Sequence, residues 1–366
     1  MQLSRTLHDK PAFSGKICII GSGMVSAIGY NAPMTAASIR ASICRYSESH
    51  ITDKAGEPMV LSMSGFIDDG LRGLDRLLAL AVPSAKEAMA PLLTGDFPKN
   101  ELFAVPICLG LAASRPGFDS NTEHLIFKRL EAETAIPFSK TQRFIIPTGH
   151  ASGLMGIEKA VELIRSGKEK FVLVGGVDSY FDEDTLVWLD ENKRLHSEKN
   201  KDGFIPGEGA GFSLVTSMDF ANRYRLKPLS MILSAVSGEE PNPFMSNSIC
   251  IGQGLTDVLR RALAVLADNE VADWIICNMN GESFRALEWS YAYLRTGKQH
   301  GEPLEIWHPA DCCGDIGAAS GPVFTGIAIA ALNKRYGSGT RPLVWTSSDH
   351  SQRSAMLLSL PIKGKS

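Results

Sequence analysis

The sequence predicts an α/β fold with largely buried sheets. Short β-rich runs alternate along the chain with segments of helical periodicity, which is typical of this class. With 366 residues, 44% of them hydrophobic and 21% charged, the chain can build a large core, organised as about two domains or one large two-part domain. The two halves of the chain also contain a similar succession of segments. FIIPTGHASG at 144–153 and EIWHPADCCGDIGAASG at 305–321 each place a Gly-rich turn between a β-rich run and a buried helix.

The elements of the first half follow from local patterns. The pattern predicts strands at 16–21, 103–110, 170–176 and 209–215, and helices at 71–91 and 153–166. The helix at 153–166 is the clearest, because apolar residues from Leu154 to Ile164 recur at helical spacing and Gly167 is well placed to end it. Residues 216–230 are expected to cross to the second half.

In the second half, the pattern predicts strands at 272–277 and 342–347, and helices at 255–268, 283–295 and 317–335. The last helix is small and apolar on nearly all sides, so we expect it to be deeply buried and closely approached by another backbone.

Composition argues against several classes of function. The net charge is −3 without a long basic block, which disfavours nucleic-acid binding. No run of about 18 apolar residues predicts a membrane span, and the polar N-terminus, residues 1–16, lacks the apolar core of a signal peptide. Seven cysteines, mostly within apolar runs, indicate reduced thiols in a cytoplasmic protein. The adjacent Cys312 and Cys313 do not match structural zinc spacing, and we predict neither a metal site nor a cofactor.

Several segments, in order and at comparable spacing, resemble the β-ketoacyl-acyl-carrier-protein synthases of the thiolase superfamily. They are IIGSGMVSAIG (19–29), ICLGLA (107–112), GHASGLMGIEKAVELIRSGKEKFVLVGGVDS (149–179), DGFIPGEGAG (202–211), NMNGES (278–283) and CGDIGAASG (313–321). The resemblance covers about residues 16–360. It implies a five-layered α-β-α-β-α fold of two similar halves, each with a mixed sheet, at 16–220 and 225–366. It also implies a homodimer, and decarboxylative condensation of acyl groups carried on a carrier protein or coenzyme A.

The three catalytic positions of that family are occupied differently here. His150 stands where the resemblance places the acyl-accepting cysteine, at a helix start that lowers a thiol pKa but disfavours an imidazolium. We expect a neutral imidazole, which would be poor at storing an acyl group. It either makes an altered acid-base or ligand contact, or fills a pocket that no longer has a catalytic role. Asn280 and Asp315 stand where the resemblance places two histidines. Asn280 is either an oxyanion donor or a turn residue. Asp315 would repel a developing oxyanion, and alternatively caps the helix beginning near Ile316 or Gly317.

Three further residues are candidates for the pocket. Ser152 could serve as a nucleophile with His150 as base, although residues two apart on a helix do not face each other. Cys313 is either a displaced thiol or a buried filler. His350 lies in the segment SSDHSQRSAMLLSL, 347–360, which replaces the family's Gly-rich gating turn, and could join His150 and Asp315 in a new site.

The expected function is that of a ketosynthase-like protein without condensing activity, acting as a structural, adaptor or partner subunit. Its expected partners are a second copy of itself and another protein, by resemblance an acyl-carrier protein or a secretion-system component. The alternative is an enzyme, an acyl-thioester decarboxylase, hydrolase or acyltransferase, with an altered site centred on His150.

Overall fold

The computed structural model describes residues 15–361 apart from 95–96, 99–100, 103 and 247. Within these residues, ten strands form one mixed sheet in the order β5-β4-β6-β7-β1-β8-β12-β11-β9-β10, and β2 and β3 form a separate hairpin. The strands of the large sheet are β1 (Ile17–Ser26), β4 (Val105–Gly110), β5 (Phe138–Ile146), β6 (Phe171–Ser179), β7 (Glu208–Ser217), β8 (Ser230–Glu239), β9 (Ala272–Cys277), β10 (His300–Trp307), β11 (Pro342–Ser347) and β12 (Gln352–Ser359).

The sheet consists of two halves with the same strand pattern. In the first, β5, β4 and β6 are parallel, β7 is antiparallel to β6, and β1 is antiparallel to β7. In the second, β10, β9, β11, β12 and β8 take the same places with the same directions. A three-residue antiparallel pairing between β1 and β8 connects the halves, so the two expected sheets are continuous at this point.

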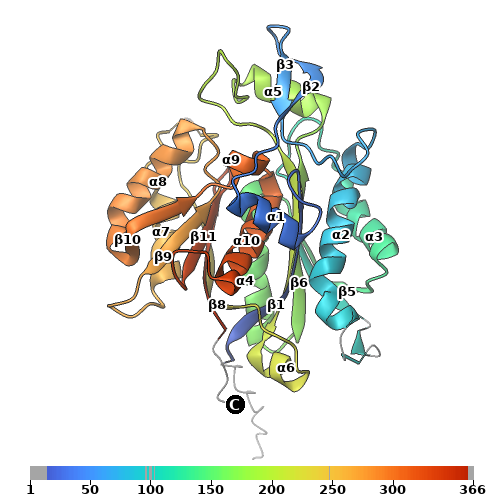
Figure 1. The fold of residues 1–366 in the computed structure, drawn as a ribbon, viewed down its shortest axis with the longest axis vertical. Coiled ribbons are helices and arrows are strands. Elements are labelled where there is room, and N and C mark those ends of the chain that lie inside the picture. The colour runs from blue at the N-terminus through green and yellow to red at the C-terminus, as the bar shows by residue number, and fades with distance from the viewer. Residues whose placement is uncertain (1–14, 95–96, 99–100, 103, 247, 362–366) are drawn as a thin grey trace, which may run out of the picture.

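Helices complete a five-layered arrangement (Figure 1). The central layer is α4 (Ser152–Arg165) and α10 (Ser320–Lys334), which contact each other and strands of both halves. One outer layer is α2 (Gly73–Leu93) with α3 (Thr122–Thr134), and the other is α7 (Gln253–Leu263) with α8 (Ser283–Thr296). The expected α-β-α-β-α architecture is therefore confirmed.

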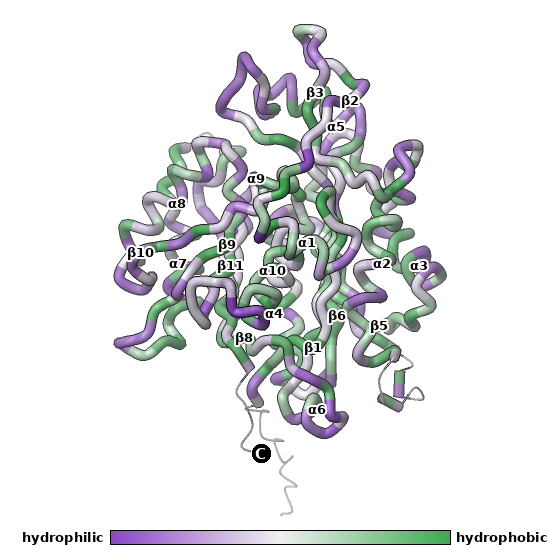
Figure 2. The backbone as a smooth tube through the Cα atoms, viewed as in Figure 1, coloured by the Kyte–Doolittle hydropathy of each residue, from purple (hydrophilic) through white to green (hydrophobic). Residues whose placement is uncertain are grey.

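β2 (Ser47–Thr52), β3 (Pro58–Leu61) and α5 (Glu183–Glu191) form a cap at one end of the molecule, whereas α6 (Met218–Arg223) lies at the opposite end (Figure 1). α1 (Ala32–Arg40) packs on α10, and α9 (Ala310–Cys313) precedes α10 in the chain. Leu61, Phe181, Leu186 and Phe204 pack together beneath the hairpin. The cap's outer loop between α5 and β7 is strongly hydrophilic (Figure 2). Among the described residues, no helix combines the length and hydropathy needed to cross a bilayer.

The predicted strands and helices are present, but several of them begin or end at other residues than predicted. The strands at 272–277 and 342–347 have the predicted bounds, whereas the first strand extends to Ser26. The helix predicted at 255–268 spans 253–263, and the helix predicted at 317–335 opens with a 3-10 turn at 317–319. Residue 103 of the strand predicted at 103–110 lies outside the described residues, as does most of the polar N-terminus.

Candidate functional site

The turn that carries His150 joins β5 to α4. β5 ends at Ile146, Gly149 adopts a φ of +74°, and a 3-10 turn at Gly149–Ala151 leads into the helix. Gly149 tolerates this left-handed backbone because it lacks a Cβ. The Ala151 N–H donates to Ser348 Oγ at 3.0 Å, and Ser348 Oγ donates to the Thr148 carbonyl at 2.6 Å. The loop between β11 and β12 therefore braces this turn.

Asp315 stands before the other central helix. Its Oδ1 accepts the Gly317 N–H at 2.8 Å, where Gly317 adopts a φ of +52° at the start of the 3-10 turn. Its own backbone pairs with residues 205–207, because its N–H donates to the Ile205 carbonyl and its carbonyl accepts the Gly207 N–H. Asp315 thus satisfies the orphan donor at the helix start, as a capping residue does.

His150, Asp315 and Asn280 are in direct contact. His150 Nε2 lies 2.8 and 3.0 Å from the two carboxylate oxygens of Asp315. Asn280 Nδ2 donates to Asp315 Oδ2 at 2.6 Å. A carboxylate only accepts hydrogen bonds, so Nε2 carries a proton that it donates to Asp315. All three positions singled out from the sequence therefore belong to one cluster, in which His150 and Asp315 are buried and Asn280 is partly buried.

The charge of Asp315 is stabilised by its surroundings. Burial raises the pKa of this carboxyl, but the His150 imidazole with its hydrogen bond, the Arg285 guanidinium and the Gly317 N–H together hold that pKa well below its usual range. Asp315 and His150 are each only 4% exposed. The site consequently contains an ionised carboxylate just before the 3-10 turn that leads into α10.

An ion-pair network extends from this cluster. Arg194 makes two hydrogen bonds of 2.7 Å to Glu282 and one of 2.6 Å to Asp349. Arg285 donates to Asp349 at 2.7 Å, and Asn280 Nδ2 also reaches Glu282 at 3.1 Å. Burial raises the pKa of Asp349, and the two guanidiniums outweigh this and lower it.

Sequence reasoning did not single out these charged residues. Glu282 lies in NMNGES and Asp349 in SSDH, two segments that the sequence had already assigned to the site. The presence of a charged residue in each of these loops could have identified them. Arg194 and Arg285 lie outside any motif, and only the fold brings them to the site.

The other predicted pocket residues are placed differently. Ser152 is fully buried, its Oγ has no hydrogen-bond partner among the described residues, and it packs against Gly110 of β4 rather than His150. The Cys313 thiol is 1% exposed and donates to the Pro309 carbonyl, and burial raises its pKa. His350 is exposed and lines the same cavity as His150, without a hydrogen bond between the two rings.

The cavity beside His150 is small. Its volume is about 110 Å³, and its wall includes Arg115, Tyr180 and Met245 besides the two histidines. Ligand sites for small molecules span roughly 300–1,000 Å³. No partner for His150 Nδ1 is found among the described residues, and the imidazole forms part of the cavity wall.

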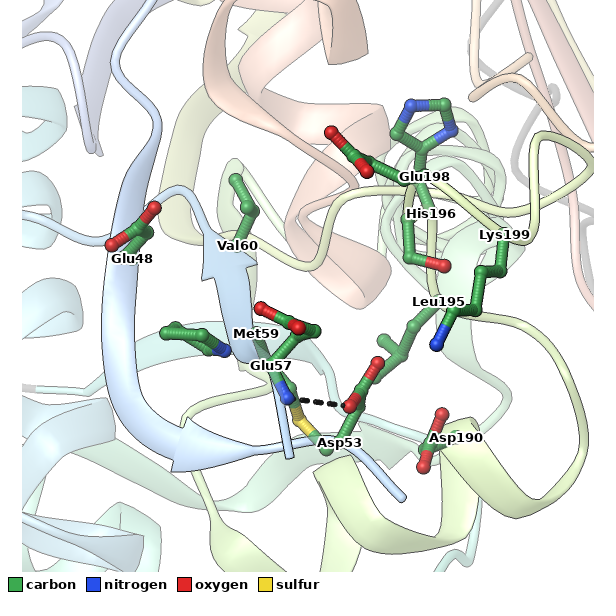
Figure 3. A pocket seen from close by; sticks show the side chains of 12 residues that line it. Glu48, Asp53, Glu57, Met59, Val60, Asp190, Leu195, His196, Glu198 and Lys199 are labelled. Atoms are coloured by element: carbon green, nitrogen blue, oxygen red, sulfur yellow. Dashed lines mark hydrogen bonds between the residues drawn. The ribbon is translucent and has the colours of Figure 1, made fainter. Parts of the chain in front are cut away.

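Larger cavities lie away from this site. One of about 370 Å³ lies between the β2–β3 hairpin and residues 190–199, and acidic side chains dominate its wall (Figure 3). Another of about 510 Å³ lies beside Trp307 and Tyr336. Neither cavity includes any of the three positions that the sequence singled out.

Part of the chain matches a protein-family model. Residues 140–221 match the model described as beta-ketoacyl synthase, N-terminal domain, and this segment contains the His150 turn. A curated relative, a highly reducing polyketide synthase of Cordyceps militaris, is 27% identical over 166 residues, 44% of this chain. The matched region spans only 6% of that relative's length.

Solved structures share the fold over almost the whole chain. The ishigamide ketosynthase/chain length factor superposes with a TM-score of 0.77 at 15% identity, covering 95% of this chain and 100% of that one. A type II polyketide synthase acyl-carrier protein in complex with its ketosynthase bound to the hexaketide gives 0.75 at 14% identity, with coverages of 95% and 100%. The ketosynthase from module 6 of the bacillaene synthase of Bacillus subtilis 168 gives 0.73 at 13% identity, with coverages of 95% and 72%. At these identities, the chain shares the ketosynthase fold.

Proposed function

We propose that this protein is a ketosynthase relative that has lost condensation and serves as a structural or adaptor subunit. The observation that carries this proposal is the cluster of His150, Asp315 and Asn280, in which His150 Nε2 and Asn280 Nδ2 both bond to the Asp315 carboxylate. Condensation needs a nucleophile that stores the acyl group, and donors directed at a developing oxyanion. The cluster provides neither.

The first missing task is acyl storage. At the start of α4 the helix end would activate a thiol, but the residue there is His150, whose Nε2 is already bonded to Asp315. Cys313 is no substitute, because its buried thiol has a raised pKa and so resists becoming a thiolate.

The second missing task is anion stabilisation. Asp315 carries a negative charge at a position where the resemblance implies a hydrogen-bond donor. A carboxylate near a thioester oxygen raises the energy of an enolate or tetrahedral oxyanion. Asn280 cannot compensate, because its Nδ2 donors already bond to Asp315 and Glu282.

A subunit role implies protein partners. One is a second copy of the chain, since β5 is an edge strand that pairs only with β4 among the described strands. Another is an acyl-carrier protein or a secretion-system component. In support, two structurally similar assemblies are named as a ketosynthase with an acyl-carrier protein and as a ketosynthase/chain length factor.

The deciding experiment is the intact mass of the protein after incubation with acyl-coenzyme A and acyl-carrier protein. We expect no adduct and no thioester turnover with the natural chain. The His150→Cys variant is the matched comparison, because it restores a thiol at the helix start without changing the turn. A stable adduct on the natural chain would contradict the proposal. A pull-down from the native host then identifies the partner.

A second candidate function is acyl-thioester processing by the His150–Asp315 pair. It is favoured by the carboxylate-bound imidazole, whose Nδ1 has no partner among the described residues while its ring lines a cavity. An imidazole held in this way can act as a general base for water. Thioester hydrolysis or decarboxylation that disappears in His150→Ala would establish this function instead.

A further inference from the structure

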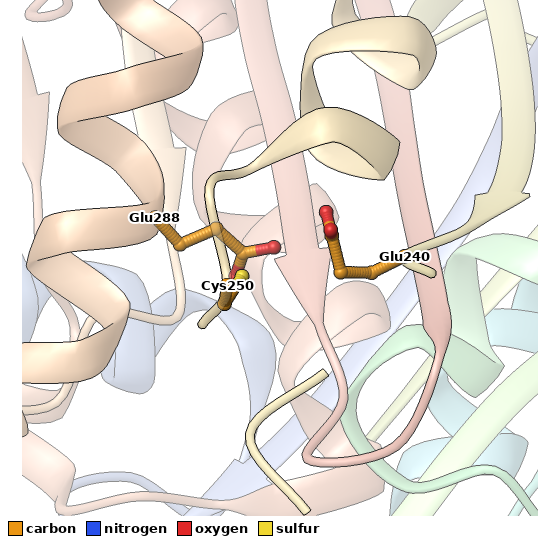
Figure 4. Close-up of side chains that lie close together, drawn as sticks. All are labelled: Glu240, Cys250 and Glu288. Atoms are coloured by element: carbon orange, nitrogen blue, oxygen red, sulfur yellow. The ribbon is translucent and has the colours of Figure 1, made fainter. Parts of the chain in front are cut away.

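A second cluster, of two buried carboxylates and one half-buried thiol, lies away from the His150 site, between β8, α7 and α8. It contains Glu240, directly after β8, Cys250 in the segment before α7, and Glu288 of α8 (Figure 4). One ligand atom from each of the three side chains lies within 4.8 Å of the other two. Glu240 and Glu288 are each only 1% exposed.

Glu240 has an incompletely satisfied carboxylate. Its Oε2 accepts the Gly254 N–H at the start of α7 at 2.7 Å. Its Oε1 is buried and has no hydrogen-bond partner among the described residues. The side chain extends toward Glu288 and Cys250 (Figure 4). A buried carboxylate oxygen without a partner is costly, and a bound cation is one of the few groups that removes the cost.

Glu288 is oriented in the manner of a metal ligand. Its Oε1 accepts a hydrogen bond from Arg353 Nε at 2.6 Å, which leaves Oε2 for a second partner. Metal-binding carboxylates are commonly fixed by such an outer hydrogen bond. Arg353 also compensates only one of the two buried carboxylates, so the pocket retains an excess of negative charge.

We propose that Glu240, Cys250 and Glu288 bind one zinc ion, with water as the fourth ligand. A thiolate beside two carboxylates favours zinc over calcium or magnesium, which take six or more oxygen ligands. Zn–S and Zn–O bonds of roughly 2.3 and 2.1 Å place ligand atoms about 3.5 Å apart in a tetrahedral site, so small side-chain movements close the present separations. Binding replaces the thiol proton of Cys250, which leaves to solvent, with the metal ion.

The ion would brace the loop beside the candidate site. Arg353, held by Glu288, also donates to the carbonyls of Ser348 and His350. Ser348 in turn bonds the turn that carries His150. Zinc at this position would therefore fix the orientation of Glu288 and, through Arg353, the loop between β11 and β12.

The test is zinc binding by the full chain after treatment with a chelator. Zinc is added in competition with a chromophoric chelator, and cadmium is used separately to detect the thiolate-to-metal absorption band. We expect one zinc per chain, and a loss of affinity of about 100-fold or more in Cys250→Ser and in Glu240→Gln. Cys44→Ser is the control, because Cys44 is an exposed cysteine outside the cluster.

The change in unfolding temperature on adding zinc is a second measurement, and it distinguishes the outcomes even if a variant is less stable than the natural chain. Zinc is expected to raise the unfolding temperature of the natural chain and of Cys44→Ser, and to leave that of Cys250→Ser unchanged. The proposal is overturned if the natural chain binds no zinc, or if Cys250→Ser binds it as tightly. A binding stoichiometry that falls only in Cys44→Ser would also overturn it, because it would place the ion elsewhere.

Discussion

At the scale of single residues, the pairing of His150 with Asp315 defines the candidate site. The two lie 165 positions apart in the chain and come together because each stands just before a central helix. The sequence indicated both positions through the turns in which they lie. Their mutual hydrogen bond depends on how the helix starts approach each other, which local patterns do not encode.

Replacing Asp315 with asparagine is expected to destabilise the protein by about 3 kcal/mol near neutral pH, because it breaks a buried charged contact. The pKa of Asp315 is lowered by folding, so its contribution is present above the unfolded pKa of about 4 and is lost as pH falls through the lower folded value. Urea unfolding of both proteins should therefore show a stability difference that is constant from neutral pH to about pH 5 and shrinks in more acidic solution. A difference that does not change with pH would contradict this assignment of charge.

Ser348→Ala is expected to cost about 1–2 kcal/mol, because its hydroxyl both accepts from Ala151 and donates to Thr148. Ser351→Ala is the matched control in the same loop, since the Ser351 hydroxyl bonds only its neighbour Gln352. Comparing the free energies of unfolding of the two variants checks the prediction. An equal change in the free energy of unfolding of both would show that the Ser348 hydrogen bonds to the turn carrying His150 stabilise the protein no more than the Ser351 hydrogen bond does.

At the scale of elements, α4 and α10 are close because small residues line their crossing. A Cβ on Gly153 would overlap the ring of Pro322, and a Cβ on Gly321 would press on Leu154. The sequence predicted this close approach from the small, apolar composition of the segment at 317–335. It did not reveal which glycines lie at the crossing, because that depends on the rotation of each helix.

Gly153→Ala is expected to destabilise the protein by about 1–3 kcal/mol, because a packed helix and a proline ring leave no room for a methyl group. Gly297→Ala is the control, since it adds the same methyl group at ordinary contact distance from Tyr293. Urea unfolding measures both. Similar stabilities for the two variants would mean that α4 and α10 are less tightly packed than described.

At the scale of the whole molecule, the sequence predicted the overall architecture better than it predicted the partly exposed strands. Buried runs such as ADWIIC and PLVWTS are mostly apolar and gave the bounds of β9 and β11. The partly exposed β8, β10 and β5 were missed in whole or in part, because polar residues interrupt their apolar pattern. The hairpin of β2 and β3 was also missed, because β2 is mostly polar and exposed.

The unpaired edge of β5 leads us to expect a homodimer with twice the 39.6 kDa mass of the chain. Sedimentation velocity at micromolar concentration measures the mass directly. His150→Ala should leave it unchanged, because His150 is buried and lies outside the β5 strand itself. A purely monomeric species would rule out pairing through this strand.

The matching strand pattern of the two halves also supplies a natural comparison for the central turns. GHASG at 149–153 and GAASG at 317–321 adopt the same sequence of left-handed glycine, 3-10 turn and helix, with alanine at 318 in the position that His150 occupies. The chain therefore already shows that this backbone closes without an imidazole. A protein carrying both His150→Ala and Asp315→Asn removes the hydrogen-bonded pair together, and should serve as an inactive control for any activity assay once its unfolding is shown to be cooperative.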